Sequence, residues 1–130
     1  MTPLPEWEGK RGDRLARFLR HILLLGTEWV ILLDEVTPHL GQSVDLEWRF
    51  GTHANVTLSG PREALLETGR AALEARLMRP EDCAFSIQRA HFSETGKWLT
   101  VKAPGCARET TLLITMRVRR REGTEHPACR

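Results

Sequence analysis

Four arginines near the end of the chain are the residues best suited to bind an anion. Arg117, Arg119, Arg120 and Arg121 fall within a short stretch, and each guanidinium presents a planar set of N–H donors that matches a carboxylate or a phosphate. The run predicts contact with phosphate or an acidic polysaccharide, chiefly through Arg117, Arg119 and Arg121. The alternative is structural, because charged side chains also discourage an edge strand from pairing with another chain.

Three tryptophans, Trp29, Trp48 and Trp98, are candidates for contact with sugar rings, since an aromatic face suits the apolar side of a pyranose. We take Trp48 as the predicted sugar contact. The alternative is that all three belong to a hydrophobic core. The chain has no catalytic signature: it lacks a glycine-rich phosphate loop and a Ser-His-Asp spacing, and no catalytic residue is assigned.

Composition narrows the class of protein. The 130 residues carry 19 basic and 17 acidic side chains, a net charge of +2, and this balance argues against nucleic acid as a partner. Neither a signal peptide nor an apolar run of the roughly twenty residues needed to cross a bilayer is visible. Cys83, Cys106 and Cys129 are odd in number and widely spaced. They are expected to be free thiols, which favours a cytoplasmic location.

The most apolar stretch, residues 14–36, predicts a β-hairpin that turns at Gly26-Thr27-Glu28. If the three-residue loop pairs Leu25 with Trp29, Arg20 lies opposite Asp34 and forms a cross-strand pair of opposite charge. Both faces of this hairpin are apolar, so it is expected to need cover on both sides. A sandwich of this size supplies one side, and the other needs more chain or a second domain.

The remaining segments also predict strands. Residues 43–50 alternate strictly, with Val44, Leu46, Trp48 and Phe50 on one face, and similar alternation follows at 56–58, 85–88, 98–103 and 110–119. Turn signals between them predict an all-β antiparallel sandwich of about seven to nine strands. The sandwich is expected over 14–121, after a leader or linker at 1–13 and before a flexible tail at 122–130.

Residues 61–78 leave two alternatives open. Their Ala, Leu, Glu and Arg content favours a helix on local propensity. Against a helix, Gly69 lies in the middle and the leucines form no single apolar stripe. Two strands that turn at Glu67-Thr68-Gly69 fit equally well, with Leu73, Ala75 and Leu77 facing inward in the second strand.

The order of these segments resembles a known domain. An arginine-bearing strand, a short turn, WVILLDEV, a polar gap and then VDLEWRF are similar to the opening of the C-terminal β-sandwich domain of heparinase II/III-like polysaccharide lyases. ALEARLMRP, residues 72–80, resembles the strand before a proline in that domain. The resemblance covers nearly all of the chain after Gly9, with Arg20, Asp34 and Trp48 as its fixed residues, and it implies strands at 63–78.

The resemblance implies β-elimination of uronate-containing polysaccharide. In that family most of the catalytic machinery lies on an upstream helical toroid, which this chain lacks, and the sandwich supplies one wall of the cleft. Tyrosine, a common acid in this chemistry, is absent. The isolated chain is therefore expected to be inactive. Its expected partners are an anionic polysaccharide and an upstream helical domain or partner chain, with no nucleic acid and no membrane.

The resemblance also implies a structural metal, zinc or calcium, in some family members. Asp34 matches the position of a carboxylate ligand, but the family's histidine falls at Gly51, so His53 is the nearest candidate imidazole. The alternative is that Asp34 pairs with Arg20 and the histidine is solvated. From a different functional class, the chain can instead be a non-catalytic carbohydrate-binding or scaffold module. A nucleic-acid binder that uses the arginine run is a third, weaker alternative.

Overall fold

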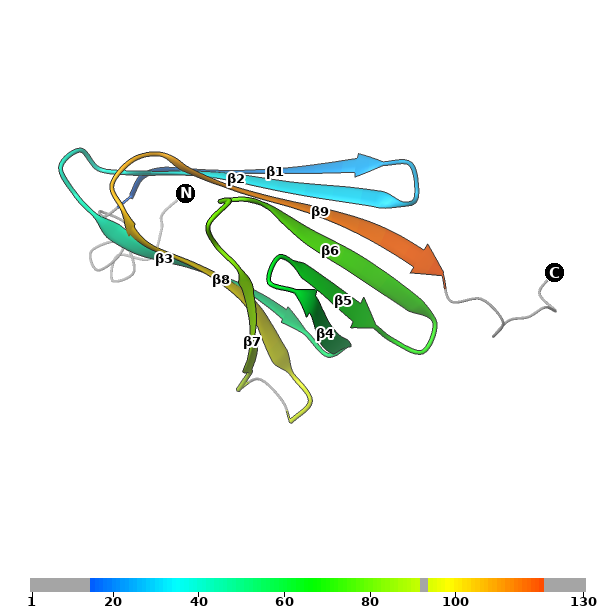
Figure 1. Ribbon diagram of the computed structural model, residues 1–130. Helices are drawn as coiled ribbons and strands as arrows, with labels where there is room; N and C mark the ends of the chain where they lie inside the picture. Colours follow the sequence, from blue (N-terminus) through cyan, green and yellow to red (C-terminus); the bar gives the residue numbers. More distant parts are fainter. Residues whose placement is uncertain (1–14, 92–93, 121–130) are drawn as a thin grey trace, which may run out of the picture.

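The chain folds into two antiparallel β-sheets (Figure 1). The computed structural model describes residues 15–91 and 94–120, and the following statements concern those residues. They contain no helix able to cross a membrane. The strands in chain order are β1 (Leu15–Leu25), β2 (Trp29–Pro38), β3 (Val44–Thr52), β4 (Asn55–Gly60), β5 (Glu63–Glu67), β6 (Ala71–Arg79), β7 (Phe85–Arg89), β8 (Lys97–Cys106) and β9 (Thr110–Arg120).

The larger sheet has six strands in the order β1-β2-β9-β6-β5-β4, and the smaller has three in the order β3-β8-β7. The chain crosses from one sheet to the other after β2, β3, β6 and β8. The prediction of an all-β antiparallel sandwich of seven to nine strands is confirmed. The leader at 1–13 lies outside the described residues, as does the tail at 122–130.

The hairpin at the start of the sheet has the predicted register. Leu25 pairs with Trp29 and Arg20 pairs with Asp34. Gly26 begins the loop with φ of +61°, a backbone conformation that glycine adopts without steric cost. This register places Arg20, Ile22 and Leu24 on the inner face of the six-stranded sheet, and it places Leu23, Leu25 and Trp29 on the outer face.

The hydrophobic core lies between the two sheets. Alternation in β3 buries Val44 and Trp48 and leaves Asp45 and Glu47 exposed. This is the expected pattern of a strand with one solvated face. The core cluster draws on both sheets and contains Leu32, Val36, Trp48, Ala64, Ala75, Leu77, Phe85, Leu99, Val101, Ala103, Leu112 and Ile114.

Residues 61–78 form two strands, β5 and β6, so the strand alternative is confirmed and the helix is excluded. β6 lies between β5 and β9 in the sheet. Ala75 and Leu77 are buried against the core, as the inward-facing alternation of the second strand predicted. Two paired neighbours supply backbone partners for both edges of β6, and this outweighs a propensity difference of a few tenths of a kcal/mol per residue.

The β1–β2 hairpin extends beyond the smaller sheet (Figure 1). Its base is covered, since Leu32 and Val36 are buried. Its tip is not: Ile22 and Leu24 on the inner face are 62% and 66% exposed. The smaller sheet therefore covers only the base of the hairpin's inner face. From the sequence we expected the sandwich to cover the whole of that face.

Candidate functional site

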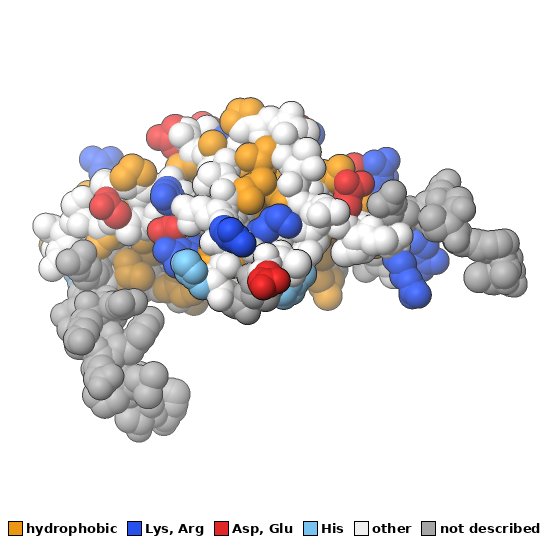
Figure 2. All heavy atoms as spheres, turned by 90° about the horizontal axis from the view of Figure 1, so that it is seen from below, with side chains coloured by type: hydrophobic (Ala, Val, Ile, Leu, Met, Phe, Trp, Pro, Cys, Tyr) orange, Lys and Arg blue, Asp and Glu red, His pale blue; other side chains and the backbone are white. Residues whose placement is uncertain are grey.

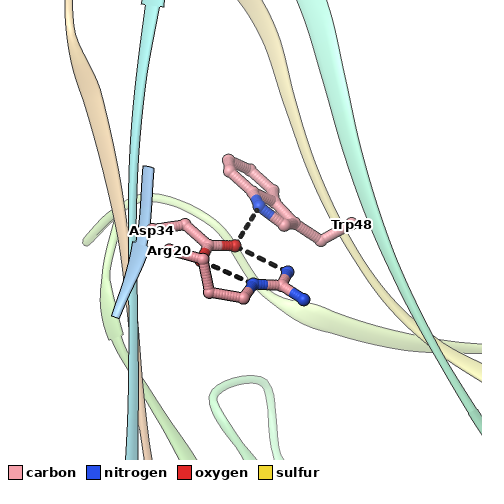
Figure 3. Close-up of polar contacts among 3 residues, drawn as sticks. All are labelled: Arg20, Asp34 and Trp48. Carbon is pink, nitrogen blue, oxygen red and sulfur yellow. Dashed lines mark hydrogen bonds and ion pairs between the residues drawn. The ribbon is translucent and has the colours of Figure 1, made fainter. Parts of the chain in front are cut away.

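A buried carboxylate at the base of the hairpin is the most constrained polar group of the described residues. Asp34 on β2 has no exposed surface. The Arg20 guanidinium, from the neighbouring strand β1, donates from Nε to Oδ1 and from Nη2 to Oδ2, both at 2.8 Å (Figure 3). This is the paired geometry in which guanidinium and carboxylate bind most strongly. The predicted cross-strand pair is therefore confirmed.

A third residue joins this pair from the other sheet. Trp48 on β3 donates its indole N–H to Oδ2 of Asp34 at 3.1 Å (Figure 3). We call Arg20, Asp34 and Trp48 the clasp, because the three side chains link β1, β2 and β3 across the two sheets. The hydrogen bond to Asp34 raises the pKa of Arg20 above its usual range, so the guanidinium stays charged. The carboxylate thus has a permanent counter-charge.

The clasp does not fit a metal site. Both oxygens of Asp34 are occupied by the clasp donors, and a guanidinium lies where a cation would have to bind. His53 is exposed and its Nδ1 lies 3.0 Å from Oγ1 of Thr95. It follows Trp48 by five residues, a separation of roughly 16 Å along a strand. The described residues hold no group of three or more His, Cys, Asp or Glu side chains placed to bind a metal ion. The predicted pairing of Asp34 with His53 is therefore not formed.

Trp48 has a structural position. Trp48 is only 7% exposed, and its indole nitrogen donates its hydrogen bond inside the clasp. This burial does not allow the predicted contact with a sugar ring, and it matches the alternative of a core residue. Trp29 is the indole that reaches solvent, at 39% exposure. Sequence spacing did not single out Trp29, because its exposure depends on how far the hairpin extends past the smaller sheet.

Two members of the arginine run, Arg117 and Arg119, lie on the outer face of β9, and each forms an ion pair. Arg117 forms an ion pair with Glu28, and its guanidinium lies 5.7 Å from the centre of the Trp29 ring. Arg119 pairs with Glu74 at 2.6 Å. Arg121 lies outside the described residues. Across the face seen in Figure 2, acidic and basic side chains are interspersed and neither sign forms a continuous patch.

The outer face of the hairpin is a large uncovered apolar surface. Leu23 and Leu25 on β1 are 52% and 46% exposed, and they lie beside the half-buried Ile31 and Leu33 of β2. Burying each such side chain would stabilise a complex by about 1–2 kcal/mol. We call this surface, which also includes Leu19 and Leu113, the outer apolar face. Apolar surface gathered in this way marks an interaction site more often than isolated exposed residues do.

Arg62 is a structural residue that no sequence pattern indicated. It follows Pro61 in the turn before β5, and its guanidinium donates to four backbone carbonyls, one near the end of β6 and three in the β6–β7 connection. The acceptors are Met78 at 2.9 Å, Pro80 at 3.0 Å, Cys83 at 3.2 Å and Glu81. One side chain thus fixes a connection between the two sheets.

Two of the three cysteines lie among the described residues. Cys83 and Cys106 are free thiols, as predicted, and both are half-buried; Cys129 lies outside the described residues. Burial raises the pKa of the Cys83 thiol, so less thiolate forms near neutral pH. Cys83 therefore lacks the thiolate character expected of a nucleophile.

Comparison with known proteins does not assign the chain to a family. A scan against models of protein families and a search of curated proteins both find no match. The function is therefore argued from the arrangement above: a buried clasp, an outer apolar face and an outer surface of paired charges.

Proposed function

We propose that this chain is the C-terminal β-sandwich domain of a heparinase II/III-like polysaccharide lyase. It supports β-elimination of a uronate-containing polysaccharide together with an upstream helical domain. Two features support the proposal. The fold is a two-sheet antiparallel sandwich, and Arg20, Asp34 and Trp48, the fixed residues of the resemblance, contact one another in the clasp.

The observation that carries the proposal is the outer apolar face. A domain that acted alone would be expected to cover Leu23 and Leu25 or to replace them with polar residues. A helical domain packed on this face would bury it, as a sheet covered by helices requires. The partner is thus expected to supply an apolar surface, and the hairpin is expected to form much of the contact.

The catalytic groups are assigned to the partner. β-Elimination needs a base that removes the proton beside the carboxylate, together with donors that neutralise that carboxylate. In this chain the Asp34 carboxylate is buried and accepts three hydrogen bonds within the clasp, so it has no path to a substrate. We therefore expect no lyase activity from the isolated chain.

The test is a lyase assay on uronate polysaccharides such as heparin and alginate, followed by the ultraviolet absorbance of the unsaturated product. We expect no product with the isolated chain, and product formation when the chain is joined to the polypeptide encoded immediately upstream. A helical upstream region rich in Tyr, His and Asn agrees with the proposal. The absence of such a region, or no product on any uronate polysaccharide tested, would contradict it.

Charged substitutions on the outer apolar face separate docking from folding. We expect Leu23→Lys and Leu25→Lys to change the free energy of unfolding of the isolated chain by no more than about 0.5 kcal/mol, because both positions are largely exposed. In the joined protein the same changes should lower lyase activity about tenfold or more, since a lysine would have to be buried in the contact. Urea unfolding and the lyase assay measure the two effects.

Val118→Lys is the matched control. Val118 is also exposed, at 40%, but it lies on the inner face near the end of β9, opposite Leu73. It should leave the activity of the joined protein unchanged. Equal losses from all three lysine variants would show that the outer apolar face has no special role.

The alternative is a non-catalytic carbohydrate-binding module. A specific observation favours it as a second candidate: an aromatic side chain and several hydrogen-bonding groups line a depression on the outer face of the larger sheet. The lyase assay with the joined protein distinguishes the two candidates, because a binding module would retain sugar affinity and give no product.

A further inference from the structure

The outer face of the six-stranded sheet carries a continuous row of side chains across five strands. Trp29 on β2 pairs with Arg117 on β9, which pairs with Glu74 on β6. Glu74 then pairs with Leu65 on β5, and Leu65 pairs with Thr57 on β4. Residues paired in this way point to the same face of a sheet. The five side chains therefore form one line that runs perpendicular to the strands.

A second row runs beside the first. It consists of Thr115 on β9, Arg76 on β6 and Glu63 on β5, each directly paired with the next. The two rows line a depression of about 500 Å³, which we call the cross-strand groove. Its five strands span roughly 19 Å at about 4.8 Å per strand. This length suits an extended ligand with several repeating units.

The charges of the cross-strand groove are balanced. Arg117 pairs with Glu28, Arg119 with Glu74, and Arg76 with Glu63, the last at 2.9 Å. The groove and its rim thus hold three guanidinium and three carboxylate groups. A polyanion would have to displace carboxylates from the arginines before it could bind, and a neutral ligand would not.

The lining favours a ring that carries hydroxyl groups. Carboxylates accept hydrogen bonds, guanidiniums donate them, and the threonine hydroxyls of Thr57 and Thr115 do both. Sugar hydroxyls also donate and accept, so they can bind to both members of an ion pair. The exposed indole of Trp29 offers an apolar face to the C–H groups of a pyranose.

A peptide fits this groove less well. The strands in its middle, β9, β6 and β5, each have a neighbour on both edges. Their backbone groups are used within the sheet, so a peptide could not add itself as a further strand there. Recognition must come from side chains alone, which suits a ligand with hydroxyl groups along its length.

We propose that the cross-strand groove binds neutral sugar residues of a polysaccharide, with Trp29 as the stacking platform. This inference rests on the proposed function in one respect, namely that the ligand is a uronate-containing polysaccharide. In a polysaccharide that combines uronate with neutral units it assigns the neutral units to this groove, beside the outer apolar face that the helical partner covers. The unit that is cleaved would then lie toward the partner.

The test is calorimetric titration of the purified chain with four hexasaccharides: neutral cellohexaose, xylohexaose and mannohexaose, and anionic hexamannuronate. We expect at least one neutral hexasaccharide to bind and hexamannuronate to bind at least about tenfold more weakly. Trp29→Ala should weaken neutral binding about tenfold or more. Trp98→Ala removes a half-buried indole on the outer face of the smaller sheet and should leave binding unchanged.

A charge variant keeps the proposal testable if Trp29→Ala fails to fold. Glu74→Gln retains the side-chain shape and releases Arg119 from its ion pair. Binding of hexamannuronate should then increase, because a guanidinium becomes available to its carboxylates. The proposal is overturned if no neutral hexasaccharide binds, if hexamannuronate binds the unmodified chain most tightly, or if Trp29→Ala has no effect. These outcomes concern sugar binding by the isolated chain, so they are independent of the lyase assay.

Discussion

Arg20→Met is expected to lower the free energy of unfolding by about 3 kcal/mol, the lower end of the cost of removing one partner of a buried ion pair, because Asp34 is buried but the Arg20 side chain is 43% exposed. Methionine keeps much of the length of the side chain and removes only the guanidinium. Asp34, which has no exposed surface, would retain a single donor, the indole N–H of Trp48. A buried carboxylate without its counter-charge is the reason for the size of the effect. Chemical denaturation followed by circular dichroism measures it.

A second substitution tests whether the uncompensated charge is the cause. In the double variant Arg20→Met, Asp34→Asn, the amide is neutral and its oxygen still accepts from Trp48, so about 2 kcal/mol of the loss should be recovered. Arg17→Met serves as the control, because Arg17 forms a longer and exposed pair with Glu35 at 3.8 Å. It should cost no more than about 1 kcal/mol. A small loss for Arg20→Met, or no recovery in the double variant, would show that the clasp contributes little to stability.

Arg62→Met is expected to cost about 2–4 kcal/mol of stability, since hydrogen bonds from a charged donor contribute more than neutral ones. The guanidinium binds the carbonyls of Met78, Pro80, Glu81 and Cys83, and methionine would leave all four without this donor. Met78 lies near the end of β6 of the larger sheet, and the other three carbonyls lie in its connection to β7 of the smaller sheet. The loss should therefore also loosen the contact between the sheets.

The control for this variant is a neighbouring arginine, the last residue of β6. Arg79 forms an exposed ion pair with Glu81, with side chains that are 58% and 74% exposed, and Arg79→Met should change stability by no more than about 0.5 kcal/mol. Hydrogen exchange of the amides between Met78 and Phe85 gives a local measurement. If the two variants lose equal stability, Arg62 does not fix this connection as its four hydrogen bonds imply.

The hairpin was predictable from sequence because its constraints are local. A three-residue loop fixes the pairing of Leu25 with Trp29, and counting back along the strands then places Arg20 opposite Asp34. The opposite charges agree with this register, and a slip of one residue would move the apolar side chains to the other face. The alternation of Val44 to Phe50 was equally informative, since it separates a buried face from a solvated one.

Residues 61–78 show where local preference is insufficient. Their composition favours a helix, but β6 lies between β5 and β9, which are distant from each other in sequence. The decisive pairing of β6 with β9, such as Leu77 with Ile114, spans more than thirty residues. Propensity alone carries no information about such a partner.

The candidate site was only partly predictable for the same reason. The pair of Arg20 and Asp34 follows from the hairpin, but the contribution of Trp48 depends on how the two sheets pack. The row from Trp29 to Thr57 requires the registers of four separate strand pairs. The predicted metal pair of Asp34 and His53 is not formed, because His53 lies beyond the end of β3 and Arg20 already neutralises the carboxylate.

Hydrogen–deuterium exchange of the β1 amides tests the proposed docking of the hairpin most directly. β1 is an edge strand of the larger sheet, so the amides on its free edge are expected to exchange quickly in the isolated chain. When the chain is joined to the helical region encoded upstream, we expect exchange between Leu19 and Leu25 to slow about tenfold or more. Unchanged exchange in β1, in a joined protein that is folded, would contradict a hairpin covered by the catalytic domain.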